Sequence, residues 1–230
     1  MLLAAFDRYP CRQSFSMPPP STSMLVLGTT NSGKLVELAA LLAPLGIDCR
    51  SLAGLSAVEV EETGSSFAEN AALKASQQAS AIGQWVLAED SGLLVDALDG
   101  SPGIYSARFA GVDATDVLNN SLLLERLAGK TGAARAAHYA CHAALANPTG
   151  EIVATSHGEC CGVIAHAPHG DGGFGYDPLF IIPEYHRTFG MISPVVKALI
   201  SHRARAMRAI IPAIVKHLSV HKTATAQAGD

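Results

Sequence analysis

Two neighbouring carboxylates, Glu89 and Asp90, are the side chains of this sequence best placed to do chemistry. They end the apolar run 85–88, which is typical of a buried strand. Adjacent strand residues point to opposite faces, so the two acids cannot enter one core together. Because an unpaired buried carboxylate is strongly destabilising, we expect at least one of them to hold a cation or a proton. Ser91 and Gly92 predict a turn that leaves both acids within reach of a ligand; the alternative is two solvated acids in that turn.

A glycine-containing loop after a short apolar strand predicts a phosphate site. Residues 25–27 are apolar, residues 28–34 read Gly-Thr-Thr-Asn-Ser-Gly-Lys, and leucines at helical spacing follow. Backbone N–H groups and the start of a helix then face a ligand above the loop, which suits phosphate, and Lys34 adds a positive charge. The same letters resemble a Walker A loop, which needs Ser or Thr after the lysine to hold Mg²⁺, but this position is Leu35. We therefore expect the acids around Asp90 to hold the metal.

A third segment, residues 172–180, reads Gly-Gly-Phe-Gly-Tyr-Asp-Pro-Leu-Phe. Glycines on both sides of Phe174 leave its ring free to stack on a nucleobase, and Asp177 can accept hydrogen bonds from a base edge. As structure alone, the same residues form a tight turn before a strand at 179–182.

A fourth segment begins at Ser193 and Pro194, which are typical of a helix cap and first turn. Lys197, His202 and Arg203 would lie near the start of that helix. Cations there oppose the helix dipole, which indicates an anionic or carbonyl-bearing ligand. The alternative is a solvated basic helix surface.

Together these segments resemble the inosine triphosphate pyrophosphatase family, whose members hydrolyse noncanonical purine nucleoside triphosphates. The resemblance runs from about residue 24 to 218, with the motifs in order. Residues 29–34 match T-x-N-x-x-K, residues 61–71 match E-E-T-G-x-T-F-x-E-N-A with Ser66 for threonine, and residues 100–108 match G-x-P-G-x-Y-S-A-R. The strand end 89–93 matches D-D-S-G-L, and residues 174–177 and 201–203 match the base-recognition motifs. The sequence departs from the family at Glu89, where many members have Asp, and at residues 190–196, which lack an acidic stretch.

The resemblance implies a role for each matched residue. Asp90 would be the catalytic base and would bind Mg²⁺ together with Glu62, with Glu89 a further candidate ligand. Attack at the α-phosphorus would give the monophosphate and pyrophosphate, which residue spacing alone does not distinguish from release of the γ-phosphate. The substrate would contact Thr29, Thr30, Asn31, Ser32, Gly33, Lys34 and Ser91, and, at the base, Phe174, Gly175, Tyr176, Asp177, Lys197, His202 and Arg203.

The elements that must position these side chains alternate between strand and helix patterns. We predict an α/β fold with a mixed sheet flanked by helices. The resemblance adds an elongated shape, two lobes with the active-site cleft between them, and a homodimer. The sequence predicts strands at 24–28, 47–52, 85–90, 93–97, 135–146, 151–165 and 179–182, and helices at 33–43, 66–82, 115–128 and 194–218.

Composition and charge restrict the possible partners. The chain has 230 residues, a net charge of −4 and a pI near 6.1, which argues against a nucleic-acid-binding surface. No apolar run reaches the roughly 18 residues of a membrane span, and we expect a cytoplasmic protein. We predict a disordered extension at 1–23, a nucleoside triphosphate pyrophosphatase domain at 24–218 and a frayed tail at 219–230.

Two other functions remain open at this point. The first is a P-loop kinase or ATPase, which Leu35 disfavours. The second is a nucleotide-binding regulator without catalysis, against which the intact Glu62, Asp90 and Lys34 count.

Overall fold

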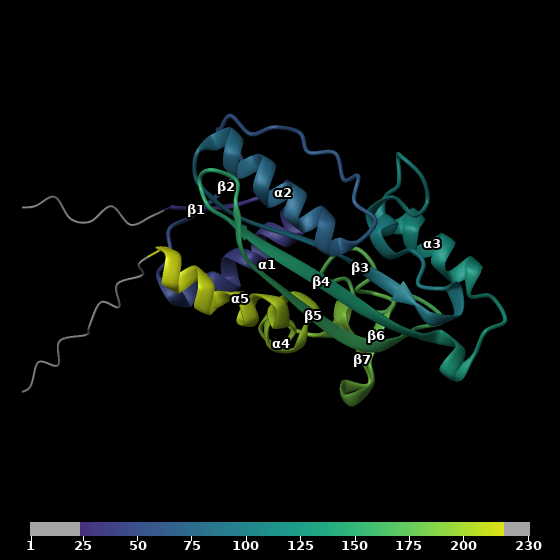
Figure 1. The fold of residues 1–230 in the computed structure, drawn as a ribbon. Coiled ribbons are helices and arrows are strands. Elements are labelled where there is room, and N and C mark those ends of the chain that lie inside the picture. Colours follow the sequence, from purple (N-terminus) through teal and green to yellow (C-terminus); the bar gives the residue numbers. More distant parts are fainter. Residues whose placement is uncertain (1–23, 219–230) are drawn as a thin grey trace, which may run out of the picture.

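A seven-stranded mixed sheet is the frame of the computed structural model, which describes residues 24–218 (Figure 1). The predictions for residues 1–23 and 219–230 lie outside the described residues. The strand order is β2-β1-β3-β4-β5-β6-β7. Strand β1 runs parallel to β2 and β3, and every other pairing is antiparallel, which confirms the predicted mixed sheet. The strands are β1 Leu25–Leu27, β2 Cys49–Ser51, β3 Trp85–Val95, β4 Ala136–Ala146, β5 Ile152–Ile164, β6 Phe180–Ile182 and β7 Arg187–Thr188.

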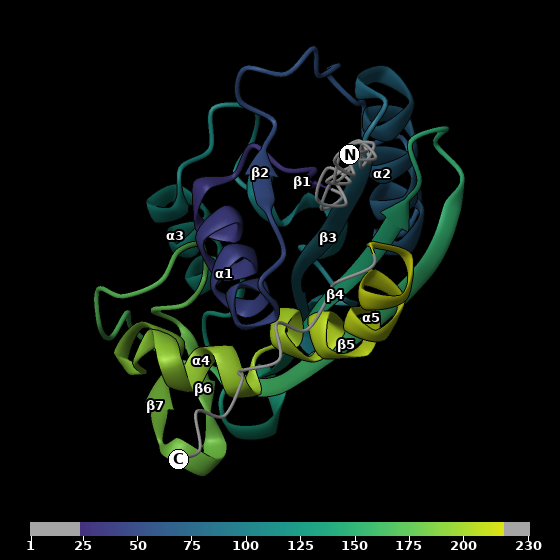
Figure 2. The same ribbon diagram turned by 90° about the vertical axis from the view of Figure 1, so that its left-hand side faces the viewer.

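Helices cover both faces of this sheet. Helices α1 and α5 pack on one face and α2 on the other, while α3 lies toward the far end of the long strands (Figures 1 and 2). The helices are α1 Ser32–Leu42, α2 Phe67–Ile82, α3 Asp116–Arg126, α4 Pro194–Ile200 and α5 His202–Leu218, and a 3-10 segment, η3, spans Gly103–Arg108. None of the helices within residues 24–218 is long and apolar enough to cross a membrane.

Successive side chains of a strand point to opposite faces of the sheet, so the strands contribute apolar residues to separate clusters on the two faces. Leu25, Leu27 and Leu87 pack with residues of α1 and α5. Val26 and Val86 point the other way, onto alanines of α2. A separate apolar cluster joins the far ends of β3, β4 and β5 to β6 and α3. The first two clusters, on the two faces of the sheet, form the core of one lobe, and the third forms the core of the other. The long strands β3, β4 and β5 connect the two lobes.

The predicted turn at Ser91 and Gly92 is wrong, because β3 continues unbroken to Val95 and pairs with β4 along its whole length. Glycine is needed at position 92 because η3 packs closely against this part of β3. A Cβ atom on Gly92 would collide with the Ser106 hydroxyl of η3, which donates to the Gly103 carbonyl and accepts from the Leu93 N–H. The two acids therefore stand in the middle of a strand.

The predicted single helix at 194–218 is also wrong. Ser201 has an extended backbone conformation (ψ 158°), which ends α4. Its side-chain oxygen accepts from the Ala204 N–H at 3.2 Å, so the same residue caps α5. The break places His202 and Arg203 in the first turn of α5, which brings both side chains to the wall of a cleft.

Candidate active site

A cleft of about 720 Å³ opens where the loop after β1, the middle of β3, η3 and the turn before β6 converge. Three of the predicted site residues do not line it: Ser32 and Gly33 lie in the first turn of α1, and Glu89 is buried. The other residues predicted for the site all line this cleft: Thr29, Thr30, Asn31, Lys34, Glu62, Asp90, Ser91, Phe174, Gly175, Tyr176, Asp177, Lys197, His202 and Arg203.

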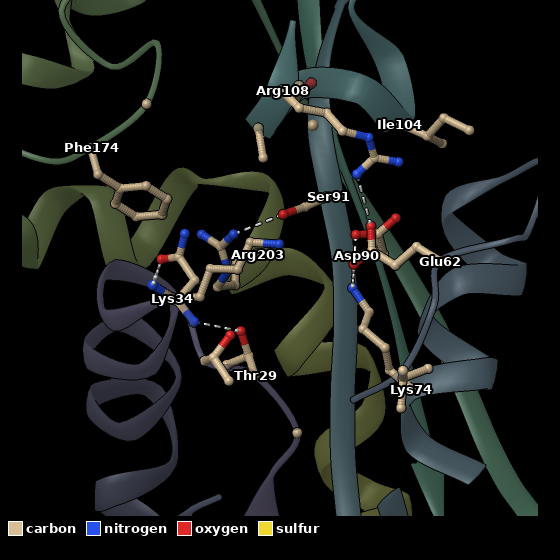
Figure 3. A pocket seen from close by; sticks show the side chains of 18 of the residues that line it. Thr29, Lys34, Glu62, Lys74, Asp90, Ser91, Ile104, Arg108, Phe174 and Arg203 are labelled. Atoms are coloured by element: carbon tan, nitrogen blue, oxygen red, sulfur yellow. Dashed lines mark hydrogen bonds and ion pairs between the residues drawn. The ribbon is translucent and has the colours of Figure 1, made fainter. Parts of the chain in front are cut away.

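Strand β3 sends its two acids to opposite faces of the sheet. Because Leu87 faces α1 and α5, Glu89 two residues later faces the same way, and Asp90 faces α2 with Ala88. Figure 3 shows Asp90 and Glu62 on one side of the strand and Ser91 with Arg203 on the other. The strand alternation thus produces two separate charge clusters, and Glu89 does not join Glu62 and Asp90.

The first cluster surrounds Asp90. The Lys74 ammonium of α2 lies 2.9 Å from an oxygen of Asp90 and 2.9 Å from an oxygen of Glu62. Arg108 of η3 approaches the other Glu62 oxygen at 3.6 Å. Asn70 donates to Asp90 at 3.3 Å and accepts from the Gly64 N–H at 2.8 Å, which fixes the segment that carries Glu62.

The protonation of this cluster follows from burial and charge. Burial raises the pKa of Asp90 above its ordinary value, although Lys74 opposes the rise. Burial acts in the same direction on Glu62, but the charge and hydrogen bond of Lys74 together with the charges of Lys34 and Arg108 lower the pKa of Glu62. Burial thus shifts Asp90 toward the protonated form, whereas the surrounding cations keep Glu62 ionised.

The second cluster surrounds Glu89. Lys34 of α1 lies 3.1 Å from Glu89, and Arg203 of α5 lies 3.3 Å from the same oxygen. Burial alone would raise the pKa of Glu89, but the charges of Arg203 and Lys34 hold it well below its usual range. Arg203 also donates to the Ser91 hydroxyl at 2.9 Å and pairs with Glu37 of α1. Glu89 thus fixes Lys34 and Arg203 beside the cleft.

The loop after β1 holds itself in shape with its own side chains. The Thr29 hydroxyl accepts from the Asn31 N–H at 3.2 Å, and the Asn31 side chain caps α1 by accepting from the Lys34 N–H at 3.0 Å. There is no space for a side chain at Gly28, because a Cβ atom there would lie 2.8 Å from a methyl group of Val86. The loop is thereby pressed against β3, and Thr30 stays exposed above it.

The far end of the cleft carries Phe174. Its ring rests on Gly33, where a Cβ atom would lie 2.5 Å from the ring. The Lys197 ammonium lies 4.9 Å from the centre of the ring, and the Arg203 guanidinium carbon lies 5.6 Å from it. One oxygen of Asp177 accepts from the Phe174 N–H at 2.9 Å and pairs with Lys197. Burial raises the pKa of Asp177.

His202 contributes an unpaired polar atom to the same wall. The residue is buried and its ring stacks on Tyr139, with the ring centres 4.5 Å apart. Its Nδ1 atom makes no hydrogen bond within residues 24–218. Burial and the nearby Arg203 charge lower the pKa of His202 well below its ordinary value, so the ring is neutral at pH 7. A buried nitrogen without a partner suits a ligand group.

Four residues of this site had no role in the sequence-based prediction: Glu37, Asn70, Lys74 and Arg108. A signal did exist for two of them. Asn70 and Lys74 lie four residues apart on the face of α2 that also carries Ala71 and Ala75, so polar groups interrupt an apolar row. Glu37 lies one turn after Lys34 on α1. Its partners Lys197 and Arg203 are far away in the sequence, and no local pattern predicts them.

Comparisons with known proteins identify the family of this chain. A dITP/XTP pyrophosphatase from an Exiguobacterium species is 49% identical over 192 residues, which cover 83% of this chain and 96% of that protein. A dITP/XTP pyrophosphatase from Rhodopirellula baltica is 47% identical over 86% of this chain and 96% of its own length. The solved structure of a HAM1 protein from Coxiella burnetii superposes with a TM-score of 0.76 at 38% identity, covering 84% of this chain and 99% of that one. The sequence model of the Ham1 family matches residues 25–213, and the chain belongs to the Ham1 family.

Proposed function

We propose that this chain hydrolyses noncanonical purine nucleoside triphosphates, those of inosine, deoxyinosine and xanthosine, to the monophosphate and pyrophosphate. The observation that carries the proposal is one cleft that contains a glycine-containing loop at a helix start, a carboxylate pair and an aromatic ring beside two cations. Relatives at 49% and 47% identity that are named dITP/XTP pyrophosphatases support the same activity. The absence of a Ser or Thr at Leu35 counts against the P-loop alternative.

The proposal includes Mg²⁺, and the residues present fit this ion. Glu62 and Asp90 come from different segments, and their oxygens already converge on one positive group, the Lys74 ammonium. Carboxylate oxygens are the protein ligands that Mg²⁺ prefers, and it commonly takes only one or two of them beside substrate phosphates and water. Within residues 24–218 no group of three or more His, Cys, Asp or Glu side chains could hold a metal ion, so phosphate and water oxygens would have to complete the coordination. When bound, the ion would polarise the phosphate and lower the pKa of a bound water.

The side chains of the cleft supply the other parts of the reaction. Asp90 accepts the proton of the attacking water, a role that suits a carboxylate whose pKa is raised by burial. Lys34 and the backbone of residues 29–33 hold the phosphates at the start of α1. Such transfer needs positioning and charge stabilisation more than covalent work by the protein.

The base end gives a chemical reason for selectivity. A 6-oxopurine presents an acceptor at O6 and a donor at N1–H, whereas adenine presents a donor at the 6-amino group and an acceptor at N1. Lys197 and Arg203 are donors beside Phe174, and Asp177 is an acceptor. Adenine would place its 6-amino donor against the donors Lys197 and Arg203 and its N1 acceptor against Asp177, and such mismatched polar contacts can discriminate strongly.

The proposal extends to a homodimer in the cytoplasm, where a nucleotide-pool enzyme meets its substrates. The large apolar side chains Val36, Val195 and Leu199 are exposed on α1 and α4 and are consistent with an interface between copies. Light scattering coupled to size-exclusion chromatography measures the state directly; a monomeric mass at micromolar concentration rejects the dimer.

A product assay tests the activity. Purified enzyme is incubated with the triphosphates of inosine, deoxyinosine and xanthosine, and with ATP and GTP, in Mg²⁺ or in EDTA. We expect pyrophosphate and monophosphate from the first three, far less from ATP, and no turnover in EDTA. Release of orthophosphate alone, with no pyrophosphatase present, would show cleavage at the γ-phosphate and reject the proposal.

A further inference from the structure

Side chains in the first half of helix α3 form hydrogen bonds with the turn that carries Phe174. Asp116 accepts from the Gly175 N–H at 2.6 Å. Asn120, four residues later on the same face of α3, donates to the Gly175 carbonyl at 3.0 Å. Both backbone hydrogen-bonding groups of Gly175 are therefore bound by side chains of α3, a helix that is 59 and 55 residues away along the chain.

Gly175 is a sensitive point at which to hold this turn. It follows Phe174 directly and has a left-handed conformation with φ +62°, where its backbone takes a path that other residues rarely adopt. The next residue, Tyr176, donates its hydroxyl proton to the Ser106 carbonyl at 2.8 Å. On the inner side, Asp177 accepts from the Phe174 N–H at 2.9 Å. The direction of the Phe174 ring thus depends on contacts at both ends of the turn.

The segment that makes these contacts also reaches the other end of the cleft. Asn119 joins α3 to η3, because it donates to the Ala107 carbonyl at 3.1 Å and accepts from the Ala110 N–H at 2.8 Å. The neighbouring Arg108 approaches Glu62 at 3.6 Å. Residues 103–120 therefore connect the ring-bearing turn to the carboxylate cluster.

We propose that Asp116 and Asn120 are positioning residues that set base affinity by holding Phe174 in its stacking orientation through Gly175. The inference rests on the proposed function, since it assumes that a purine stacks on Phe174. Neither side chain needs to touch the phosphate or the attacked phosphorus. Their loss should therefore weaken purine binding and leave the rate of the bound complex nearly unchanged.

Three substitutions separate the hydrogen bonds from the charge. Asp116→Ala removes both the acceptor and the charge, whereas Asp116→Asn removes the charge and keeps an acceptor oxygen with the same reach. Asn120→Asp keeps the shape and replaces the donor with a group that repels the Gly175 carbonyl. The matched control is Asp113→Ala in the loop before α3, because Asp113 is exposed and its carboxylate has no hydrogen bond or ion pair within residues 24–218.

The experiment measures KM and kcat for inosine triphosphate and the dissociation constant of inosine monophosphate by calorimetry. Asp116→Ala should raise KM and the dissociation constant about tenfold, the effect of one charge-assisted hydrogen bond, with kcat within about twofold. Asn120→Asp should raise both by a similar factor, about tenfold, because its carboxylate repels the Gly175 carbonyl that the amide had bound. Asp116→Asn should stay within about threefold of the wild type, and the control should equal it. Inhibition by inorganic tripolyphosphate, which has no base, should not change in any variant.

Several outcomes would overturn the inference. Equal losses in Asp116→Ala and Asp116→Asn would assign the effect to the charge at the helix start. A fall in kcat together with weaker tripolyphosphate inhibition would show a general disturbance of the cleft. Unchanged affinity for inosine monophosphate would remove α3 from base binding. Because calorimetry requires no turnover, an inactive wild type would reject the proposed function and still leave this binding test decisive.

Discussion

Replacing Lys74 with methionine should destabilise the metal-free protein and enlarge its stabilisation by Mg²⁺. The Lys74 ammonium lies 2.9 Å from both Glu62 and Asp90, whose side chains are 28% and 8% exposed. Removing one partner of a fully buried ion pair costs about 3–5 kcal/mol. Because Glu62 is partly exposed and can turn to water, we expect a loss of about 2 kcal/mol. In a domain of this size that corresponds to a fall in Tm of about 4–8 °C.

Thermal unfolding in EDTA and in a series of Mg²⁺ concentrations measures both effects. Mg²⁺ should raise the Tm of Lys74→Met more than that of the wild type, because two free carboxylates then face the ion without a competing ammonium. Lys216→Met on the exposed side of α5 is the control, since Lys216 makes no ion pair within the described chain. If Lys74→Met melts like the wild type in EDTA, or gains no more from Mg²⁺, then Lys74 does not occupy the place of the cation and the reasoning fails.

Three further substitutions or deletions test other parts of the site. Asp90→Asn should lower kcat for pyrophosphate release at least about a hundredfold, which is the low end of the effect of a general base, and should leave the circular dichroism spectrum unchanged. Activity within a few-fold of the wild type would exclude Asp90 as the base. Gly33→Ala places a methyl group 2.5 Å from the ring of Phe174 and should raise KM for every purine triphosphate by a similar factor, and an unchanged KM would show that the ring has room to move. Deleting residues 1–23 should leave kcat and Tm nearly unchanged, because that segment carries none of the motifs, and a marked loss of either would contradict the prediction.

Local pattern was sufficient for much of the fold. The apolar run before Glu89 predicted a buried strand, and the period of a strand predicted that Glu89 and Asp90 face apart, as they do. The prediction of a turn at Gly92 failed because the reason for this glycine is a contact with η3, which local sequence does not show. Turn residues and close-approach glycines have the same letters but different causes.

The same limit applies to the charged groups of the site. Lys34 was identified from its own loop, but its partner Glu89 lies on β3 and the two meet only after the sheet has formed. The break at Ser201 is a local cap, which a longer helical pattern of apolar residues concealed. The sequence therefore allowed us to predict which charged side chains belong to the site, whereas the partner of each charged group depended on the packing of distant elements.

The pairing of charges around the cleft has a consequence for how substrate arrives. Each cation there already has a carboxylate neighbour, and Glu59, Glu61 and Asp116 add further acidic side chains to the lining, so the cleft presents no excess positive charge to the surrounding solvent. Screening weakens any remaining field beyond a Debye length of about 10 Å. Capture of a nucleotide should then depend on random encounter and short-range fit rather than on long-range attraction, and its on-rate should not fall as the ionic strength rises. The same lack of a positive field should make nucleic acids and other abundant polyanions poor competitors for the cleft. The cations are Lys34, Lys74, Arg108, Lys197 and Arg203, and the carboxylates paired with them are Glu37, Glu62, Glu89, Asp90 and Asp177.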